Sequence, residues 1–81
     1  MSGVINREPH YRDVVLSSNG YVLIDTRYTF DDFFETMVFR CDKDGNITKE
    51  EDWLEIDCER YPSAKEMNDG HKRMIEKWSI K

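Results

Sequence analysis

The chain has 81 residues, a formal net charge of −5, and 38% hydrophobic and 12% aromatic residues. This length fits one small domain, and the apolar content suffices for a core and argues against intrinsic disorder. The acidic balance disfavours nucleic acid or an anionic membrane as partner, because neutralising phosphates requires a basic surface. No apolar run approaches the roughly 20 residues of a membrane span. No signal-peptide pattern is present, and the chain has two cysteines, so we expect a cytosolic protein with reduced thiols.

The first twelve residues show no periodic pattern, so we predict an irregular lead-in, residues 1–12, within one domain that spans residues 1–81. Asn19-Gly20 lies between two β-branched runs, which is typical of a β-hairpin with a tight turn. An alternative interpretation places a short helix over residues 9–18, ended by the glycine. The valine pair at residues 14–15 favours the hairpin.

Three later segments alternate apolar and polar side chains with the period of a strand: residues 21–30, 34–41 and 54–61. A polar connection over residues 42–52 joins the last two, and we expect one turn of helix just before Trp53. The last segment alternates most cleanly, so its apolar residues are predicted to face the core and its acidic residues to face solvent. These residues are Leu54, Ile56 and Cys58 on the core side, and Glu55, Asp57 and Glu59 on the solvent side.

The clearest element is a helix over residues 63–78. Ser63 and Glu66 form a capping box directly after a proline, which is typical of a helix N-terminus. Apolar side chains then recur at helical spacing and give the helix one buried face. Gly70 costs about 1 kcal/mol relative to alanine in mid-helix, which predicts that the helix backbone closely approaches the element beneath it. The apolar positions are Ala64, Met67, Met74, Ile75 and Trp78.

These elements predict an α+β domain, in which an antiparallel sheet of three or four strands in meander order carries one C-terminal helix on one face. The opposite face of the sheet also carries apolar residues and needs a cover. We expect it to form a two-fold homodimer interface, or else to be covered by the N-terminal segment. The residues predicted for the dimer face are Phe34, Val38 and Tyr28, next to Val22 and Ile24.

Acidic residues concentrate in the middle of the chain, where residues 31–60 hold eleven acids and four bases. We predict that they form an acidic surface that binds the basic groove of a protein partner, with fast and salt-sensitive association. A solvated face that keeps a small protein soluble is the alternative interpretation. The residues assigned to this surface are Glu55, Asp57, Glu59, Asp31, Asp32 and Glu35, with Glu50, Glu51 and Asp52 nearby.

No metal or cofactor site is predicted. The segment over residues 42–48 looks like a calcium loop, but its glycine is fourth rather than sixth, so we predict a β-turn. The four soft ligands of the chain lack the compact spacing of a zinc site, and the expected register sets Cys58 opposite Met37, which disfavours a disulfide. These ligands are Cys41, Cys58, His10 and His71.

His71 lies within the apolar stripe of the predicted helix. We interpret it as a hydrogen-bonded histidine at the edge of the core. The alternative is a general base paired with a carboxylate. No nucleophile is placed by a motif, and no glycine-rich phosphate loop is present, so no catalytic residue is assigned.

Four short motifs stand out: Asp25-Thr26…Thr29-Phe30-Asp31, Glu35-Thr36-Met37-Val38-Phe39, Asp57-x-x-Arg60-Tyr61 and Gly70-His71-x-x-Met74-x-x-Lys77-Trp78. Together they resemble a group of small hypothetical proteins of bacteriophages and prophages, although a small residue expected near residues 32–34 is replaced by Asp-Phe-Phe. The resemblance implies an accessory phage product in the host cytoplasm and implies no activity. We therefore expect a non-enzymatic protein that binds a host defence or nucleic-acid-binding protein. The alternatives are a small hydrolase or metal-dependent enzyme that uses His71, and a structural homodimer of the virion or prophage.

Overall fold

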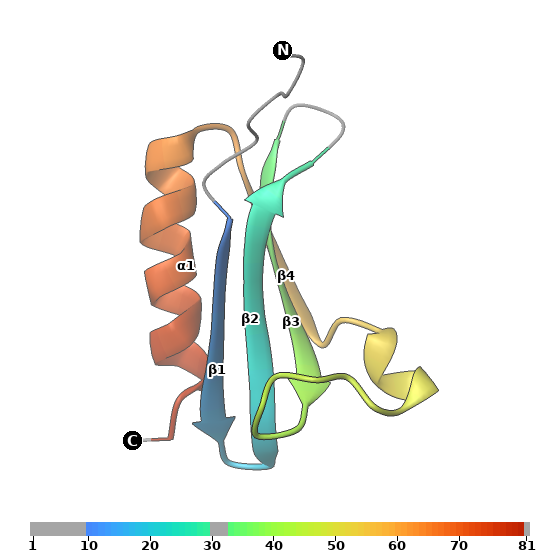
Figure 1. Cartoon of the computed structure of the whole chain (residues 1–81). Helices are drawn as coiled ribbons and strands as arrows, with labels where there is room; N and C mark the ends of the chain where they lie inside the picture. The colour runs from blue at the N-terminus through green and yellow to red at the C-terminus, as the bar shows by residue number, and fades with distance from the viewer. Residues whose placement is uncertain (1–9, 30–32, 81) are drawn as a thin grey trace.

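Residues 10–29 and 33–80, which the computed structural model describes, form four antiparallel strands and one C-terminal α-helix (Figure 1). The strands follow one another across the sheet in chain order, and the helix packs on one face. This architecture confirms the predicted α+β meander. The elements are β1 (Tyr11–Ser17), β2 (Gly20–Tyr28), β3 (Phe34–Cys41), the 3₁₀ helix η1 (Glu50–Trp53), β4 (Asp57–Tyr61) and α1 (Ala64–Trp78).

β1 and β2 form the predicted hairpin and not the alternative helix. Ser17 pairs with Gly20, so the two turn residues end at Asn19, one position earlier than expected. Gly20 has a φ of 113°, in the left-handed region that favours glycine, and the Ser17 hydroxyl donates to its carbonyl oxygen over 2.7 Å. β1 already begins at Tyr11, so the lead-in is shorter than predicted, and its residues 1–9 lie outside the described residues.

The N-terminus of α1 is capped as its sequence predicts. The Ser63 hydroxyl oxygen accepts from the Glu66 backbone N–H over 3.3 Å, and the same hydroxyl donates to the Glu66 carboxylate over 3.1 Å. Gly70 faces the sheet, where a Cβ atom would overlap the ring of Tyr61 on β4. The predicted close approach of the helix backbone is therefore confirmed, and Tyr61 is the residue beneath it.

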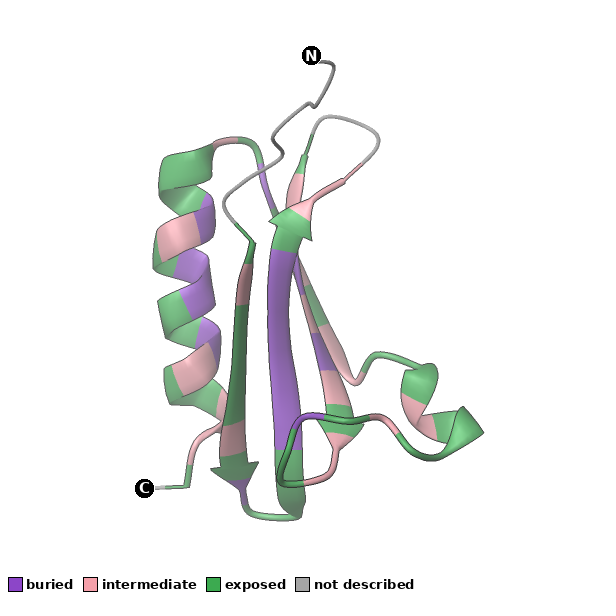
Figure 2. Ribbon diagram, in the orientation of Figure 1, coloured by how far each residue is buried: buried purple, intermediate pink, exposed green. Residues whose placement is uncertain are grey.

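The core lies between α1 and the two central strands. Val22 and Ile24 of β2 and Val38 of β3 pack against Met74, and Met67 is fully buried about two helical turns away on the same side. Figure 2 shows the buried residues along β2 and on the side of α1 that faces the sheet. Each such side chain contributes roughly 1.5–3 kcal/mol by leaving water, so this contact is the main source of stability.

The helix covers the face of the sheet that was predicted to be open. Val38 is fully buried beneath α1, so its assignment to an exposed dimer face is wrong. By strand alternation, Phe34 and Tyr28 point to the same side of the sheet as Val38. Their rings meet edge to face, with the ring centroids 5.1 Å apart. Both faces of the central strands carry apolar residues, so alternation alone does not decide which face the helix takes.

The last strand is shorter than predicted. Its sides are reversed, whereas Ile56, which directly precedes it, packs against the core as predicted. β4 begins at Asp57, while Leu54 is 74% exposed and Cys58 is exposed on the side opposite the helix. Asp57 and Glu59 lie on the helix side. β4 is an edge strand beside the flank of α1, so these positions meet the basic residues of that flank rather than its apolar stripe.

Candidate binding site on the uncovered face of the sheet

A chain of hydrogen bonds, buried except at its Asp13 end, joins the helix to all four strands. The Tyr61 hydroxyl donates to Thr36 over 3.0 Å, Thr36 contacts Thr26, and Thr26 contacts Nδ1 of His71 over 2.6 Å. Nε2 of His71 contacts the Asp13 carboxylate over 2.7 Å. His71 is 5% exposed, so its expected place as a hydrogen-bonded histidine at the edge of the core is confirmed.

Hydroxyl, imidazole and carboxylate follow one another here in the order of a nucleophile, its base and the orienting acid. The hydroxyl belongs to Thr26, which is 0% exposed between the sheet and α1. A substrate atom cannot reach it in this conformation. Each ring nitrogen of His71 already has a partner within the fold, so we interpret this chain as a device that fixes the helix on the sheet.

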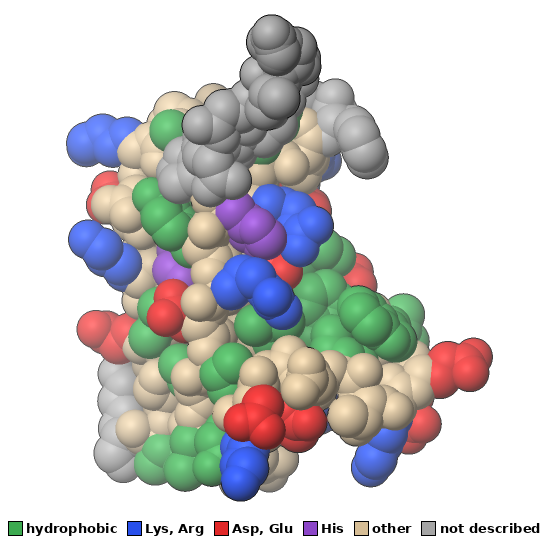
Figure 3. All heavy atoms as spheres, viewed as in Figure 1, with side chains coloured by type: hydrophobic (Ala, Val, Ile, Leu, Met, Phe, Trp, Pro, Cys, Tyr) green, Lys and Arg blue, Asp and Glu red, His purple; other side chains and the backbone are tan. Residues whose placement is uncertain are grey.

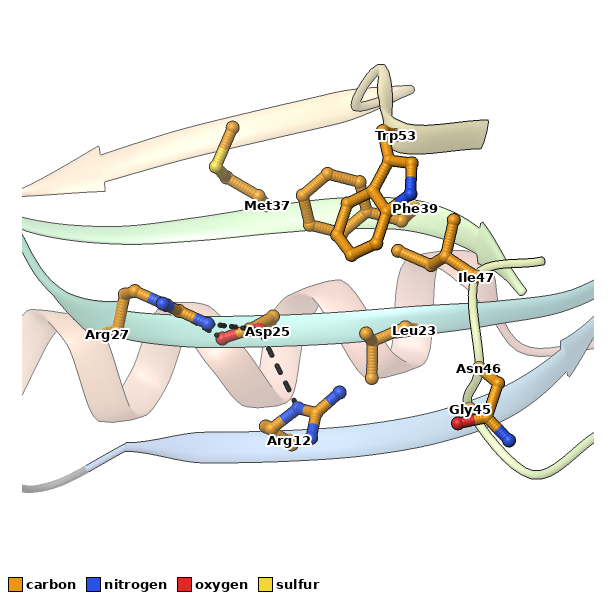
Figure 4. Close-up of a pocket in the computed structure, with 10 residues that line it drawn as sticks. All are labelled: Arg12, Leu23, Asp25, Arg27, Met37, Phe39, Gly45, Asn46, Ile47 and Trp53. Atoms are coloured by element: carbon orange, nitrogen blue, oxygen red, sulfur yellow. Dashed lines mark hydrogen bonds and ion pairs between the residues drawn. The ribbon is translucent and has the colours of Figure 1, made fainter. Parts of the chain in front are cut away.

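The uncovered face of the sheet holds a hollow of about 580 Å³. Leu23 of β2 lies at its floor, and the apolar walls come from β3, η1 and the connection between β3 and η1 (Figure 4). Two arginines lie at the other end. Figure 3 shows apolar side chains gathered on this face, with histidine and basic side chains on one side and acidic ones on a protruding segment at the other. The residues that line its apolar walls and its basic end include Met37, Phe39, Ile47, Trp53, Arg12 and Arg27.

Asp25 gathers the cations at the basic end of this hollow. Its side chain is only 7% exposed and pairs with Arg27 at 2.7 Å, His10 at 2.7 Å and Arg12 at 3.7 Å. Burial acts to raise the pKa of Asp25, but the hydrogen bonds and positive charges of Arg27 and His10 outweigh it and lower the pKa below its ordinary value. One carboxylate shared by two guanidinium groups leaves this end of the hollow net positive.

Asp25→Asn tests this cluster. A lowered folded-state pKa contributes stability that is present above the unfolded pKa of about 3.9 and is lost as pH falls through the lower folded-state pKa. We expect Asp25→Asn to cost roughly 1–3 kcal/mol at pH 7, because hydrogen bonds to a charged group are lost. The difference from wild type should shrink below about pH 4. Urea denaturation across this pH range measures both effects.

The matched control for this variant is Glu76→Gln, which removes an exposed carboxylate from α1. It should leave the free energy of unfolding at neutral pH nearly unchanged. A constant difference between Asp25→Asn and wild type down to pH 2 would contradict the lowered pKa.

A protruding segment bounds the hollow on its other side. We call residues 50–55 the acidic arm; it comprises η1 and the next two residues (Figure 1). Trp53 is 63% exposed and Leu54 is 74% exposed. The ring centroids of Trp53 and Phe39 lie 6.4 Å apart. Among the described residues no ion pair is found for Glu50, Glu51 or Glu55. The arm therefore combines two large exposed apolar side chains with unpaired negative charge.

The predicted acidic surface is divided by the structure. Glu55 belongs to the arm, whereas Glu35 pairs with Arg60 at 3.6 Å. Asp57 accepts from Lys77 at 2.7 Å and from the Trp78 ring N–H at 2.9 Å, and Glu59 pairs with Arg73 at 2.6 Å. Asp31 and Asp32 lie outside the described residues. Among the described members of the predicted surface, Glu55 on the arm is therefore the one without an ion pair.

The Asp57 carboxylate ties β4 to α1 through Lys77 and Trp78, and these contacts also affect its pKa. Burial acts to raise it, but hydrogen bonds from Lys77, Trp78 and the Cys58 backbone N–H, with the Lys77 charge, lower it overall. Charge reversal at Asp57 would therefore disturb the contact between β4 and α1. The arm offers cleaner positions at which to test a role for negative charge.

The thiols and the turn after β3 take structural roles. Cys58 lies opposite Met37, as predicted, and donates to Glu35 over 3.6 Å. Burial and the Glu35 charge raise the Cys58 pKa to about 11, so the thiol stays protonated at neutral pH. The Asp42 carboxylate accepts two backbone N–H groups, from Asp44 and Asn46, at 2.9 Å each, which confirms a turn there. Within the described part of the chain no three metal-ligating side chains cluster.

Comparison of the chain with protein-family models, with curated proteins and with solved structures found no significant match. None of the helices in the described ranges combines the length and apolar character of a membrane span. The hollow itself was not predicted, although Asp25 and Arg27 sit two apart on one strand face, where opposite charges can pair.

Proposed function

We propose that the chain is a non-enzymatic accessory protein that acts by binding a protein partner through the acidic arm. The observation that carries this proposal is the exposure of Trp53 and Leu54 beside carboxylates for which the described residues supply no ion pair. Tryptophan is enriched at the centres of protein interfaces, where a few such anchors supply most of the binding energy. The complementary partner offers an apolar pocket with a basic rim, which the negative charge of the arm attracts over distance.

This proposal keeps the predicted binding through acidic charge but places it on the arm, residues 50–55, instead of along β4. Glu55 remains in the contact, whereas Asp57 and Glu59 are held by α1. The resemblance to small phage proteins supports a target in the host cytoplasm, such as a defence or nucleic-acid-binding protein with a basic groove. Both ring nitrogens of His71 are engaged inside the fold, so the geometry gives no support to the alternative of a hydrolase.

Affinity capture from a host lysate tests the arm. Glu50→Lys/Glu51→Lys/Glu55→Lys should lose the proteins that wild type retains, because reversed charge repels a basic rim. Trp53→Ala should lose the same proteins without any change of charge. Truncation of an anchor residue weakens the binding free energy by roughly 2 kcal/mol or more. Added salt should elute them from wild type, because it shortens the screening length between exposed charges from about 8 Å at physiological ionic strength to about 3 Å at 1 M.

The matched control is Glu76→Lys, a reversal of an exposed acid on α1, far along the chain from the arm. It should retain the same proteins as wild type. Retention of identical proteins by all variants would refute the role of the arm. Circular dichroism of each variant confirms that it is folded.

A further inference from the structure

The hollow and the acidic arm lie beside each other on one face of the molecule; both expose apolar side chains, and they differ in the sign of their charge. The hollow is apolar, with a net positive end at Arg12 and Arg27. The arm is also apolar, and its carboxylates are without ion pairs among the described residues. Trp53 belongs to both, because it lines the rim of the hollow and yet is 63% exposed.

The arm cannot fill the hollow of its own molecule. η1 stands out from the sheet, and the Trp53 ring rests against Phe39 at the rim rather than over Leu23 at the floor (Figures 1 and 4). A second molecule has no such restriction. A two-fold axis that lies roughly in the plane of this face, between the hollow and the arm, brings each arm over the other hollow, and two equal contacts then close the assembly.

We propose that the protein forms a two-fold symmetric dimer through the uncovered face of the sheet, in which the acidic arm of each copy fills the hollow of the other. This inference rests on the proposed function of the arm as the contact, and it names a second copy as the partner. Each site is incomplete alone, since the second copy supplies the apolar side chains of its arm. The carboxylates of that arm meet Arg12 and Arg27.

Charge distribution favours a second copy over a foreign acidic peptide. A uniformly acidic ligand would be attracted to Arg12 and repelled by the neighbouring arm of the same face. A face that is positive at one end and negative at the other is matched in sign by its own two-fold copy. Arginine is well suited to this contact, because its planar fork can hold a carboxylate with two hydrogen bonds.

Charge exchange tests the dimer. Glu50→Lys/Glu51→Lys/Glu55→Lys reverses the arm, and Arg12→Glu reverses the exposed cation of the hollow without removing the closer partners of Asp25. We expect wild type to show twice the 9.7 kDa chain mass by light scattering, and each variant alone to be monomeric. Each variant pairs like charges at both contacts, which should weaken association by roughly tenfold or more.

An equimolar mixture of the two variants should recover the dimer. In the mixed pair the natural arm of one chain meets the natural hollow of the other, and the reversed arm meets the reversed hollow. Recovery on mixing also shows that both variants are folded. The matched control Arg40→Glu reverses an exposed arginine of β3 and should stay dimeric like wild type.

A variant without charge change makes the test independent of Arg12. Trp53→Ala truncates an exposed side chain and should leave a folded monomer. A wild-type protein that is monomeric at millimolar concentration would overturn the inference, and so would a dimer that all variants retain. If the monomer still captures proteins through the arm, the proposed function stands and only the second copy is rejected.

Discussion

Gly70→Ala should destabilise the protein, although alanine is the better helix former. The added Cβ atom would overlap the far end of the Tyr61 ring, which is 3% exposed and held by its hydroxyl at Thr36. Overpacking of this kind costs about 1–3 kcal/mol and occasionally more. The helix gains about 1 kcal/mol from the glycine replacement. Because the ring has little room to move, we expect a net loss of roughly 2 kcal/mol.

This loss is large for a small domain, which unfolds with only about 4–12 kcal/mol at this length. Urea denaturation followed by circular dichroism measures it. The informative control is Tyr61→Val, which removes the ring and lets the helix backbone keep its position. In that background Gly70→Ala should become neutral or stabilising. If both backgrounds respond alike, the contact between Gly70 and Tyr61 is not what opposes the alanine.

Elements determined by neighbours in the chain could be predicted from the sequence. Ser63 caps α1 through its own hydroxyl three residues before Glu66, and β3 has the predicted bounds. Even the register of Cys58 against Met37 follows from the polar connection that precedes β4. These features rely on local hydrogen bonds and on the period of side chains, which a single sequence displays.

The choice of sheet face could not be predicted, because it depends on partners far away in the chain. Val38 and Phe39 are neighbours in an apolar strand, yet the first is buried under α1 and the second borders the hollow. The buried hydroxyls of Thr26 and Thr36 show why α1 takes this side. They need a hydrogen-bonding partner, and His71 supplies one from the helix.

The sequence did not predict the arm, because the alternation of apolar and polar residues begins at Leu54, before the real start of β4 at Asp57. Leu54 and Ile56 read as strand residues, but pairing with β3 begins only where the Ile56 N–H donates to the Val38 carbonyl oxygen over 2.8 Å. Leu54 therefore stays 74% exposed beside Trp53. The strand-like alternation thus hid the exposure of Trp53 and Leu54, the two most exposed large apolar residues of the described chain. These two residues provide the apolar contact of the arm.

His71→Leu should cost roughly 2–4 kcal/mol, although leucine fits a buried helix position. The imidazole contacts Thr26 at 2.6 Å and Asp13 at 2.7 Å, and leucine can replace neither contact. The Thr26 hydroxyl would remain buried without its acceptor, at a cost of about 1–3 kcal/mol, and the altered shape adds a packing loss. Asp13 is 53% exposed, so water can compensate for its lost partner.

A double-mutant cycle with Thr26→Val isolates this contact. Valine removes the hydroxyl that His71 would otherwise leave unpaired, so the combined loss should be clearly smaller than the sum of the two single losses. Asp13→Asn is the mild control, because its amide oxygen still accepts from Nε2. Strict additivity in the cycle would show that Thr26 and His71 do not stabilise each other.

The direction of the hydrogen bonds gives this chain a second, spectroscopic test. Each hydroxyl has one proton, and Tyr61 donates its proton to Thr36. If Thr36 then donates to Thr26, the Thr26 proton goes to Nδ1 of His71, and the imidazole proton must lie on Nε2 toward Asp13. Nitrogen-15 NMR should therefore show an unprotonated Nδ1 in the folded protein. A protonated Nδ1 would reverse the chain and leave Thr36 without the acceptor assigned to it here.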